Sequence, residues 1–264
     1  FLLPQHLLSR LMFRFARIRA PWIKNNFTSW FVSNYKVNLN EAVLEDIKEY
    51  KHFNDFFTRA LKAGSRPLSD SKVVSPVDGV VSQFGNIEGS MIVQAKGKKF
   101  SVEALLAGNS EVDLYSSFAT IYLSPKDYHR IHMPFDGILK SMKYIPGNLF
   151  SVNQRTVNNI DQVFARNERL ICNFNTEYGE IAIVMVGAIF VGSMETSWEG
   201  QITPPYDKSL KTYQYESRQI DLSKGEELGR FNMGSTVILL MPKGSPDLNL
   251  EIGQALKMGQ SISN

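Results

Sequence analysis

The sequence contains one cysteine and no long apolar run, and both absences narrow the class of protein. With Cys172 alone no intrachain disulfide can form, which excludes a secreted fold held together by disulfides. Its apolar neighbours Leu170 and Ile171 favour a buried structural thiol over a nucleophile. No window approaches the roughly 20 apolar residues that cross a bilayer as a helix. At 264 residues the chain can bury a sizeable core in one large domain or two small ones.

Acidic residues are absent from residues 1–36, although the whole chain is nearly neutral, with 29 Lys and Arg against 26 Asp and Glu. Six basic residues fall in this segment, namely Arg10, Arg14, Arg17, Arg19, Lys24 and Lys36. The rest of the chain therefore carries a slight acidic excess. This asymmetry indicates that residues 1–36 contact an anionic surface, and it does not indicate a groove for nucleic acid.

The same segment has the spacing of an amphipathic helix. Apolar side chains share one sector of a helical wheel and basic ones lie beside it: Leu7, Leu8, Leu11, Met12, Phe15 and Ile18 beside Arg10, Arg14 and Arg17. Pro21 ends or restarts the helix, and apolar residues continue at three-to-four spacing to Phe31. Basic residues beside a stripe of Leu, Phe and Trp are typical of a helix in a membrane interface. The alternative is an amphipathic helix packed on the protein's own core or on a second subunit.

A further helix is expected over residues 41–50 after an Asn40 cap, followed by three phenylalanines at positions 53, 56 and 57. A short helix is also expected over residues 102–106, between a Ser101 cap and Gly108. The remaining chain is β-rich, with short runs punctuated by Gly and Pro over residues 73–81, 91–95, 119–123, 138–145, 170–174, 181–191 and 236–241.

These patterns predict an α+β fold. Its helical N-terminal region, residues 1–66, is the candidate for membrane association, and it lies on a mostly antiparallel β domain, residues 67–264, that would carry any catalytic site. The boundary is expected near residues 64–72, where the helical spacing gives way to β-rich runs.

Three local sequences could carry chemistry: Ser75-Pro76-Val77-Asp78-Gly79, Asp127-Tyr128-His129-Arg130-Ile131-His132 and Met233-Gly234-Ser235-Thr236. Each alone has an ordinary explanation as a turn, a structural pair of histidines or a strand entrance. A metal site is not expected, because the histidine pair has no third ligand at a familiar spacing. Together an Asp, a His and a Ser are the set that orients a base, removes a proton and presents a hydroxyl. Their order in the sequence leaves open whether they meet in space.

These sequences belong to longer blocks that resemble the bacterial and mitochondrial class of phosphatidylserine decarboxylases. The blocks extend over nearly the whole chain, at residues 53–59, 76–79, 94–97, 100–106, 128–134, 149–153, 164–169 and 234–236. One departure is visible, since the family's usual Leu-Gly-Ser-Thr reads Met233-Gly234-Ser235-Thr236. Leu and Met have similar volumes, so this departure leaves the motif's role intact.

The resemblance implies a proenzyme that cuts itself between Gly234 and Ser235. In that family the serine hydroxyl attacks the preceding glycine carbonyl, the peptide becomes an ester, and elimination leaves an N-terminal pyruvoyl group. Asp78 and His132 match the pair that activates the serine, with Asp78 orienting the imidazole and His132 taking the proton. The expected products are a large chain of residues 1–234 and a small chain of residues 235–264.

The resemblance also implies the reaction of the mature enzyme. The pyruvoyl group, a covalent cofactor derived from Ser235, forms a Schiff base with the serine amine of phosphatidylserine, and carbon dioxide then leaves. His129 is the candidate proton donor to the resulting carbanion, and its alternative role is only to shape the turn. Phosphatidylethanolamine is the product. The expected partners are phosphatidylserine in the membrane and, in a homodimer, a second copy of the chain. The expected location is the cytoplasmic face of a bacterial inner membrane, with the mitochondrial inner membrane as second choice.

Three other functions remain open at this point. The first is a serine hydrolase that keeps an intact Asp78–His132–Ser235 triad, although the sequence lacks the Gly-x-Ser-x-Gly elbow. The second is a peripheral membrane scaffold that uses only the amphipathic front end. The third is a pyruvoyl decarboxylase of a free amino acid, which leaves that front end unexplained. A denaturing gel separates the first two from a decarboxylase, because only the decarboxylase splits into two chains.

Overall fold

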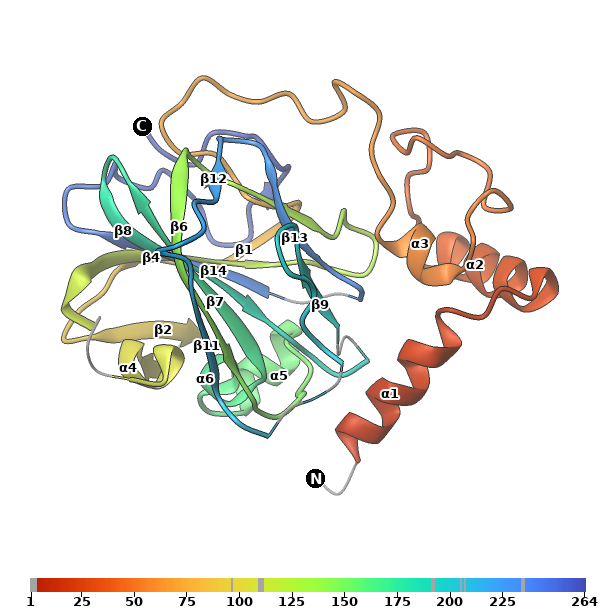
Figure 1. Cartoon of the computed structure of the whole chain (residues 1–264), viewed down its shortest axis with the longest axis horizontal. Helices are drawn as coiled ribbons and strands as arrows, with labels where there is room; N and C mark the ends of the chain where they lie inside the picture. The colour runs from red at the N-terminus through yellow and green to blue at the C-terminus, as the bar shows by residue number, and fades with distance from the viewer. Residues whose placement is uncertain are drawn as a thin grey trace.

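The computed structural model of the chain describes residues 4–95, 97–108, 112–190, 193–204, 206, 208–233 and 236–264 (Figure 1). Gly234 and Ser235, the predicted cleavage site, lie outside the described residues. The helices are α1 Gln5–Phe15, α2 Pro21–Tyr35, α3 Phe53–Phe57, α4 Val102–Leu106, α5 Gln154–Asn159 and α6 Val163–Arg166, with a 3-10 turn at Val112–Leu114. Figure 1 shows α1, α2 and α3 on one side of the molecule, beside the β sheets. In the part of the chain that the structure describes, no helix is both long and apolar enough to cross a membrane.

The helices on either side of Pro21 form as predicted. Pro21 is the first residue of α2, where its missing N–H loses no helical hydrogen bond. Lys36 ends α2 in the left-handed conformation, with φ of 54°. The short α4 is also confirmed with its predicted bounds, and the Ser101 hydroxyl caps it by accepting from the N–H of Ala104.

The helix predicted over residues 41–50 is wrong, because these residues form turns. The buried Lys24 of α2 binds their carbonyl groups, with its Nζ 2.8 Å from the oxygen of Lys48 and 2.6 Å from that of Tyr50. Carbonyls that converge on one ammonium group do not point along a common axis, as they do in a helix. The next helix, α3, begins only at Phe53, where the His52 ring nitrogen accepts from the N–H of Asp55 at 3.0 Å.

The strands form three antiparallel sheets, which confirms an α+β fold dominated by sheet. A nine-stranded sheet has the order β11-β6-β7-β8-β14-β4-β1-β15, with β12 also paired to β6; a four-stranded sheet has the order β10-β9-β13-β5; β2 pairs with β3. The bounds are β1 Gly79–Asn86, β2 Met91–Ala95, β3 Lys98–Ser101, β4 Tyr115–Tyr122, β5 Arg130–His132, β6 Gly137–Ile145, β7 Arg169–Thr176, β8 Gly179–Val186, β9 Met194–Thr196, β10 Gly200–Gln201, β11 Lys211–Gln214, β12 Asp221–Leu222, β13 Glu227–Phe231, β14 Thr236–Pro242 and β15 Ala255–Leu256.

The first predicted β run, residues 73–81, becomes a strand only at Gly79. Pro76 has no N–H to donate to a ladder, so the residues before Gly79 make only an isolated bridge between Val74 and Ser261. The predicted run over residues 181–191 also ends early, since β8 ends at Val186.

Two hydrophobic clusters hold these parts together. The larger fills the space around the nine-stranded sheet and includes Cys172 of β7, which is buried as expected. The smaller joins α2 and α3 through Phe31, Phe53 and neighbouring aromatic rings. Met233 packs against both clusters. Met233, in the predicted cleavage-site motif, is therefore one point where the helical part and the β core touch.

Candidate active site

His132 lies on β5 with both ring nitrogens engaged. Its Nδ1 is 2.8 Å from the carbonyl oxygen of Gly225, and its Nε2 is 3.0 Å from the hydroxyl of Tyr128. A carbonyl can only accept, so the proton of the neutral ring sits on Nδ1 and Tyr128 donates to Nε2. Burial lowers the pKa of His132 and raises that of Tyr128 to about 12, so both are neutral near pH 7. The basic nitrogen of His132 is therefore Nε2, and Tyr128 covers it.

His129 lies just before β5 and is completely buried. Its Nδ1 is 2.8 Å from the carbonyl oxygen of Asp127, while its Nε2 has no hydrogen-bond partner among the described residues. Its ring packs against Phe57, with centroids 4.1 Å apart. Burial lowers the pKa of His129 to about 3. Near neutral pH the side chain thus presents an uncharged ring with an unpaired, basic Nε2.

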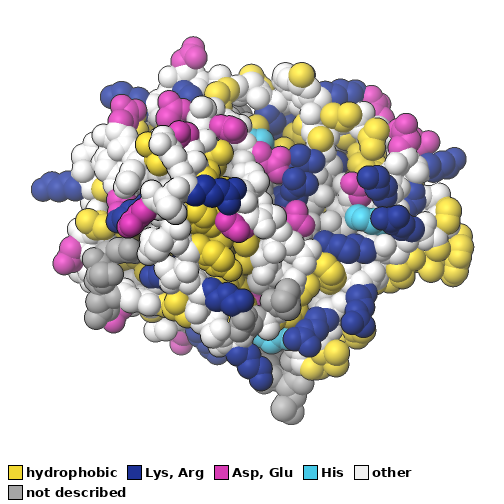
Figure 2. All heavy atoms as spheres, in the orientation of Figure 1, with side chains coloured by type: hydrophobic (Ala, Val, Ile, Leu, Met, Phe, Trp, Pro, Cys, Tyr) yellow, Lys and Arg dark blue, Asp and Glu magenta, His cyan; other side chains and the backbone are white. Residues whose placement is uncertain are grey.

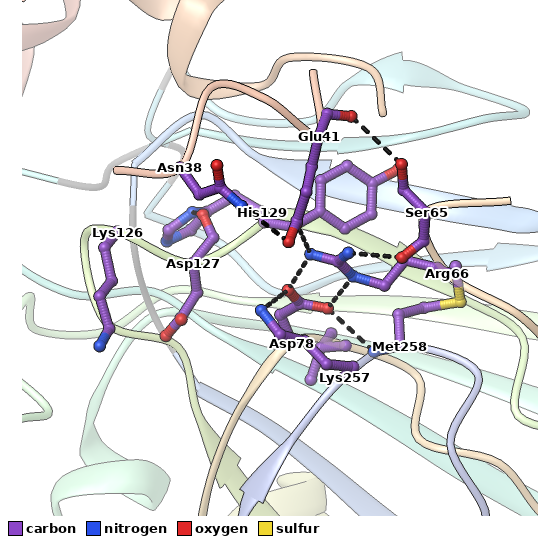
Figure 3. Close-up of polar contacts among 12 residues, drawn as sticks. Asn38, Glu41, Ser65, Arg66, Asp78, Lys126, Asp127, His129, Lys257 and Met258 are labelled. Atoms are coloured by element: carbon purple, nitrogen blue, oxygen red, sulfur yellow. Dashed lines mark hydrogen bonds and ion pairs between the residues drawn. The ribbon is translucent and has the colours of Figure 1, made fainter. Parts of the chain in front are cut away.

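Asp78 lies at the entrance of β1 and is bound by an arginine rather than a histidine (Figure 3). Arg66 grips it with two hydrogen bonds, Nε to Oδ1 at 2.8 Å and Nη2 to Oδ2 at 2.6 Å. Lys257 Nζ at 3.0 Å and the N–H of Met258 at 2.9 Å complete the shell. Burial alone would raise the pKa of Asp78, but the bonds from Arg66 and Met258 and the positive charges outweigh it and hold the pKa below its ordinary value. Neither ring nitrogen of His132 bonds to this carboxylate, because Gly225 and Tyr128 occupy them.

Close backbone packing fixes the position of Asp78. A Cβ atom at the next residue, Gly79, would lie 2.5 Å from the carbonyl oxygen of Tyr122, so this approach of β1 to β4 requires glycine. Arg66 continues outward to Glu41, with Nη2 2.6 Å from Oε2. No sequence motif indicates Arg66, because its role depends on pairing with residues that are distant in the sequence.

The residues before the cleavage site are anchored by a buried asparagine. Asn232 Nδ2 donates to Glu195 Oε1 at 2.9 Å and to Ser193 Oγ at 2.5 Å, and its Oδ1 accepts from Asn54 at 2.9 Å. The N–H of Phe231 donates to the carbonyl of His129 at 3.0 Å. His129 and the segment that leads to the cleavage site are therefore neighbours. Asn232 lies within the cleavage-site motif, but nothing in the pattern predicts its partners.

A cavity of 340 Å³ opens beside Met233. Mostly apolar side chains line it, including Phe31 of α2, Phe57 of α3 and Tyr122 of β4. Phe57 also contacts the His129 ring, so the imidazole lies behind part of the cavity wall. An apolar cavity of this kind suits part of a lipid better than a polar metabolite. No group of three His, Cys, Asp or Glu side chains in the described ranges is placed to hold a metal ion.

Comparisons with known proteins assign this arrangement to a class of lipid decarboxylases. The family model described as Phosphatidylserine decarboxylase matches residues 53–264, and a model described as PSD matches residues 1–36. The chain therefore belongs to the phosphatidylserine decarboxylase family, whose members are carboxy-lyases.

Several curated relatives align with the entire chain. It is 51% identical over 275 residues to the phosphatidylserine decarboxylase proenzyme of Pseudomonas putida strain GB-1, covering 95% of that protein. The corresponding proenzyme of Pseudomonas fluorescens strain Pf0-1 is 50% identical over 276 residues, with 95% of it covered. That of Ectopseudomonas mendocina strain ymp is 49% identical over 274 residues, with 96% covered. These comparisons give no support to the serine hydrolase alternative.

Proposed function

We propose that the chain decarboxylates phosphatidylserine to phosphatidylethanolamine after cutting itself between Gly234 and Ser235. The pyruvoyl group formed from Ser235 supplies the electron-withdrawing carbonyl to which the substrate amine attaches before carbon dioxide leaves. The observation that carries the proposal is the unpaired Nε2 of the buried His129, whose ring packs on Phe57 in the wall of the cavity at Met233. This nitrogen and this cavity supply a proton acceptor and an apolar space near the segment that leads to the predicted cleavage site.

His129 fits a role as carrier of one proton. With a pKa of about 3 its ring holds no extra proton at neutral pH, so it cannot begin the reaction as an acid. Nε2 can instead accept a hydrogen bond from the substrate amine group and take its proton once bond formation at that nitrogen has lowered the nitrogen's pKa. The imidazolium thus formed, costly in a buried site, then returns that proton to the carbon from which carbon dioxide has left. Taking and returning one proton leaves His129 unchanged after a turnover.

His132 and Asp78 serve the cut itself in this proposal. Nε2 of His132 is its only basic nitrogen, so Tyr128 must release it before it can take the serine proton. Asp78 supports the reaction by holding Lys257 and Met258, which belong to the future small chain, against the future large one. The two future chains are thereby held together before and after the cut.

The N-terminal helices α1 and α2 supply the contact with the membrane. Leu7 and Leu11 of α1 and Trp22 and Trp30 of α2 are exposed, with Trp22 at 72%. Figure 2 shows Lys and Arg side chains gathered where α1 and α2 adjoin the sheets, and hydrophobic side chains along the outer edge over α2. Apolar side chains next to basic ones suit a peripheral protein on an anionic surface. We place it on the cytoplasmic face of a bacterial inner membrane. A homodimer remains a prediction.

Intact mass spectrometry tests the proposal. The purified protein should show two chains, residues 1–234 and residues 235–264, and the smaller should resist N-terminal sequencing. Ser235→Ala should remain one inactive chain. Borohydride with phosphatidylserine should add the lipid mass to the small chain. A Ser235→Ala protein that still divides at this bond, or a single-chain wild type that decarboxylates, would overturn the mechanism.

A further inference from the structure

A second cavity, of 430 Å³, lies between α1 and the β core, away from Met233. His6, Arg10, Pro146, Gly147, Glu168, Tyr206 and Lys208 line it. Two hydrogen bonds dock α1 beside it: the N–H of Leu149 donates to Gln5 Oε1 at 2.8 Å, and the N–H of Phe190 donates to Ser9 Oγ at 3.2 Å. The helix therefore forms one wall of the cavity and the core forms the other.

Glu168 supplies a buried, incompletely satisfied carboxylate to this cavity. The residue is 1% exposed, and its Oε2 accepts from the Tyr144 hydroxyl at 3.0 Å. Its Oε1 has no hydrogen-bond partner among the described residues. Burial raises the pKa of Glu168 to about 7, because it outweighs the hydrogen bonds from Tyr144 and Thr203 that favour the charged form. A positively charged hydrogen-bond donor in the cavity would stabilise the charged form further.

The rim of the cavity has the opposite charge. Arg10 and Lys208 are both exposed, and the Arg10 guanidinium lies over the Tyr206 ring, 5.5 Å from its centroid. His6, one helical turn before Arg10, packs on the same ring, with centroids 5.2 Å apart. The cavity thus has a carboxyl group at its buried end and two cationic side chains at its mouth. A molecule with an ammonium group at its end and a phosphate next to it matches both charges.

We propose that this cavity binds the headgroup of an aminophospholipid, with the primary ammonium on Glu168 and the phosphodiester on Arg10 and Lys208. A membrane source is favoured because α1, which forms the wall, also carries the exposed Leu7 and Leu11. The site differs from the reaction cavity at Met233, so it does not require turnover. An enzyme that holds a phosphatidylethanolamine there stays attached to membranes that contain its own product.

Soluble headgroups provide the first test, with binding to the Ser235→Ala chain followed by calorimetry or NMR. Glycerophosphoethanolamine should bind at least tenfold more tightly than glycerophosphocholine, whose quaternary nitrogen cannot donate a hydrogen bond to Glu168. Glu168→Gln should abolish this preference. The matched control is Glu180→Gln on β8, since Glu180 also has an oxygen without a partner among the described residues but pairs with Lys140 elsewhere. It should bind as the parent does.

Two further experiments identify the ligand and its source. Arg10→Gln with Lys208→Gln should weaken both headgroups equally and keep the preference for ethanolamine. Phosphatidylcholine vesicles that contain phosphatidylethanolamine should retain the parent better than pure phosphatidylcholine vesicles, and Glu168→Gln should show no such gain. Inorganic phosphate binding as tightly as glycerophosphoethanolamine, an unchanged preference in Glu168→Gln, or no gain on ethanolamine vesicles would each overturn the proposal. Far-ultraviolet circular dichroism confirms that each variant is folded.

Discussion

Replacing Arg66 by Gln should destabilise the protein far more than replacing Lys257 by Gln, although both side chains bind the same carboxylate. The Arg66 side chain is 7% exposed and holds Asp78, itself 1% exposed, through two hydrogen bonds while also reaching Glu41. Removing one partner of a buried ion pair costs about 3–5 kcal/mol. Lys257 and the N–H of Met258 still bind Asp78 in the variant, so we expect the lower end, about 3 kcal/mol.

Lys257 is 51% exposed, and water screens its charge. Half-exposed ion pairs contribute about 0–1 kcal/mol, so Lys257→Gln should cost less than about 1 kcal/mol of unfolding free energy.

The pH dependence of stability supplies a second criterion. Because the pKa of Asp78 lies below its model-peptide value of 3.8 when folded, its ion pairs contribute stability above that pH. This stability is lost as the pH falls through the depressed pKa, and the gap between Arg66→Gln and its parent should narrow there.

Equilibrium urea unfolding of the Ser235→Ala chain measures these differences, because a single chain keeps the transition independent of protein concentration. With a slope of about 3 kcal/mol per molar urea, Arg66→Gln should shift the midpoint by roughly 1 M at pH 7. Equal midpoint shifts for Arg66→Gln and Lys257→Gln would refute the burial argument. So would a gap between parent and Arg66→Gln that stays constant into strong acid.

Three other outcomes are expected. Glu168→Gln should stabilise the precursor by about 3 kcal/mol at pH 8 and not at pH 4.5. The pKa of Glu168 is about 7 in the folded chain against 4.5 in the unfolded chain, so its ionisation destabilises the fold only as the pH rises. Calorimetry at both pH values checks this, and equal effects at both would contradict it. His129→Ala should cut itself normally yet release carbon dioxide from labelled substrate about 10²–10⁴-fold more slowly, and a normal rate would remove its catalytic role. Replacing Trp22 and Trp30 by Ser should weaken binding to anionic vesicles at least tenfold. Ile252→Ser, at an exposed site on the C-terminal segment, serves as its control and should bind like the parent.

Local signals account for the parts of the fold that the sequence predicted. Pro21 separates two helices because its ring fits the first turn of a helix and no later one. Ser101 marks the start of α4 through a bond to a backbone N–H three residues away. The apolar run of residues 236–241 becomes β14, whose residues are all buried. Each of these outcomes depends on residues close together in the chain.

Contacts between distant residues account for what the sequence could not predict. The helix expected over residues 41–50 gives way to turns in which Lys24, on another element, binds three of their carbonyls. The resemblance pointed to Asp78 and His132, but Arg66 and Gly225 determine how these side chains are held. No local pattern contains such pairings.

The central position of β14 in the nine-stranded sheet bears on whether folding comes before or after chain cleavage. This strand pairs with β8 on one side and β4 on the other. A cut between Gly234 and Ser235 would leave every one of these pairings in place, so scission would alter the covalent chain but not the architecture. Once denatured, the two pieces would have to find each other in solution, whereas in the uncut chain β14 is tethered to the rest of the sheet. A protein cut there would therefore have to fold first, and its persistence would depend on slow unfolding rather than on renewed folding.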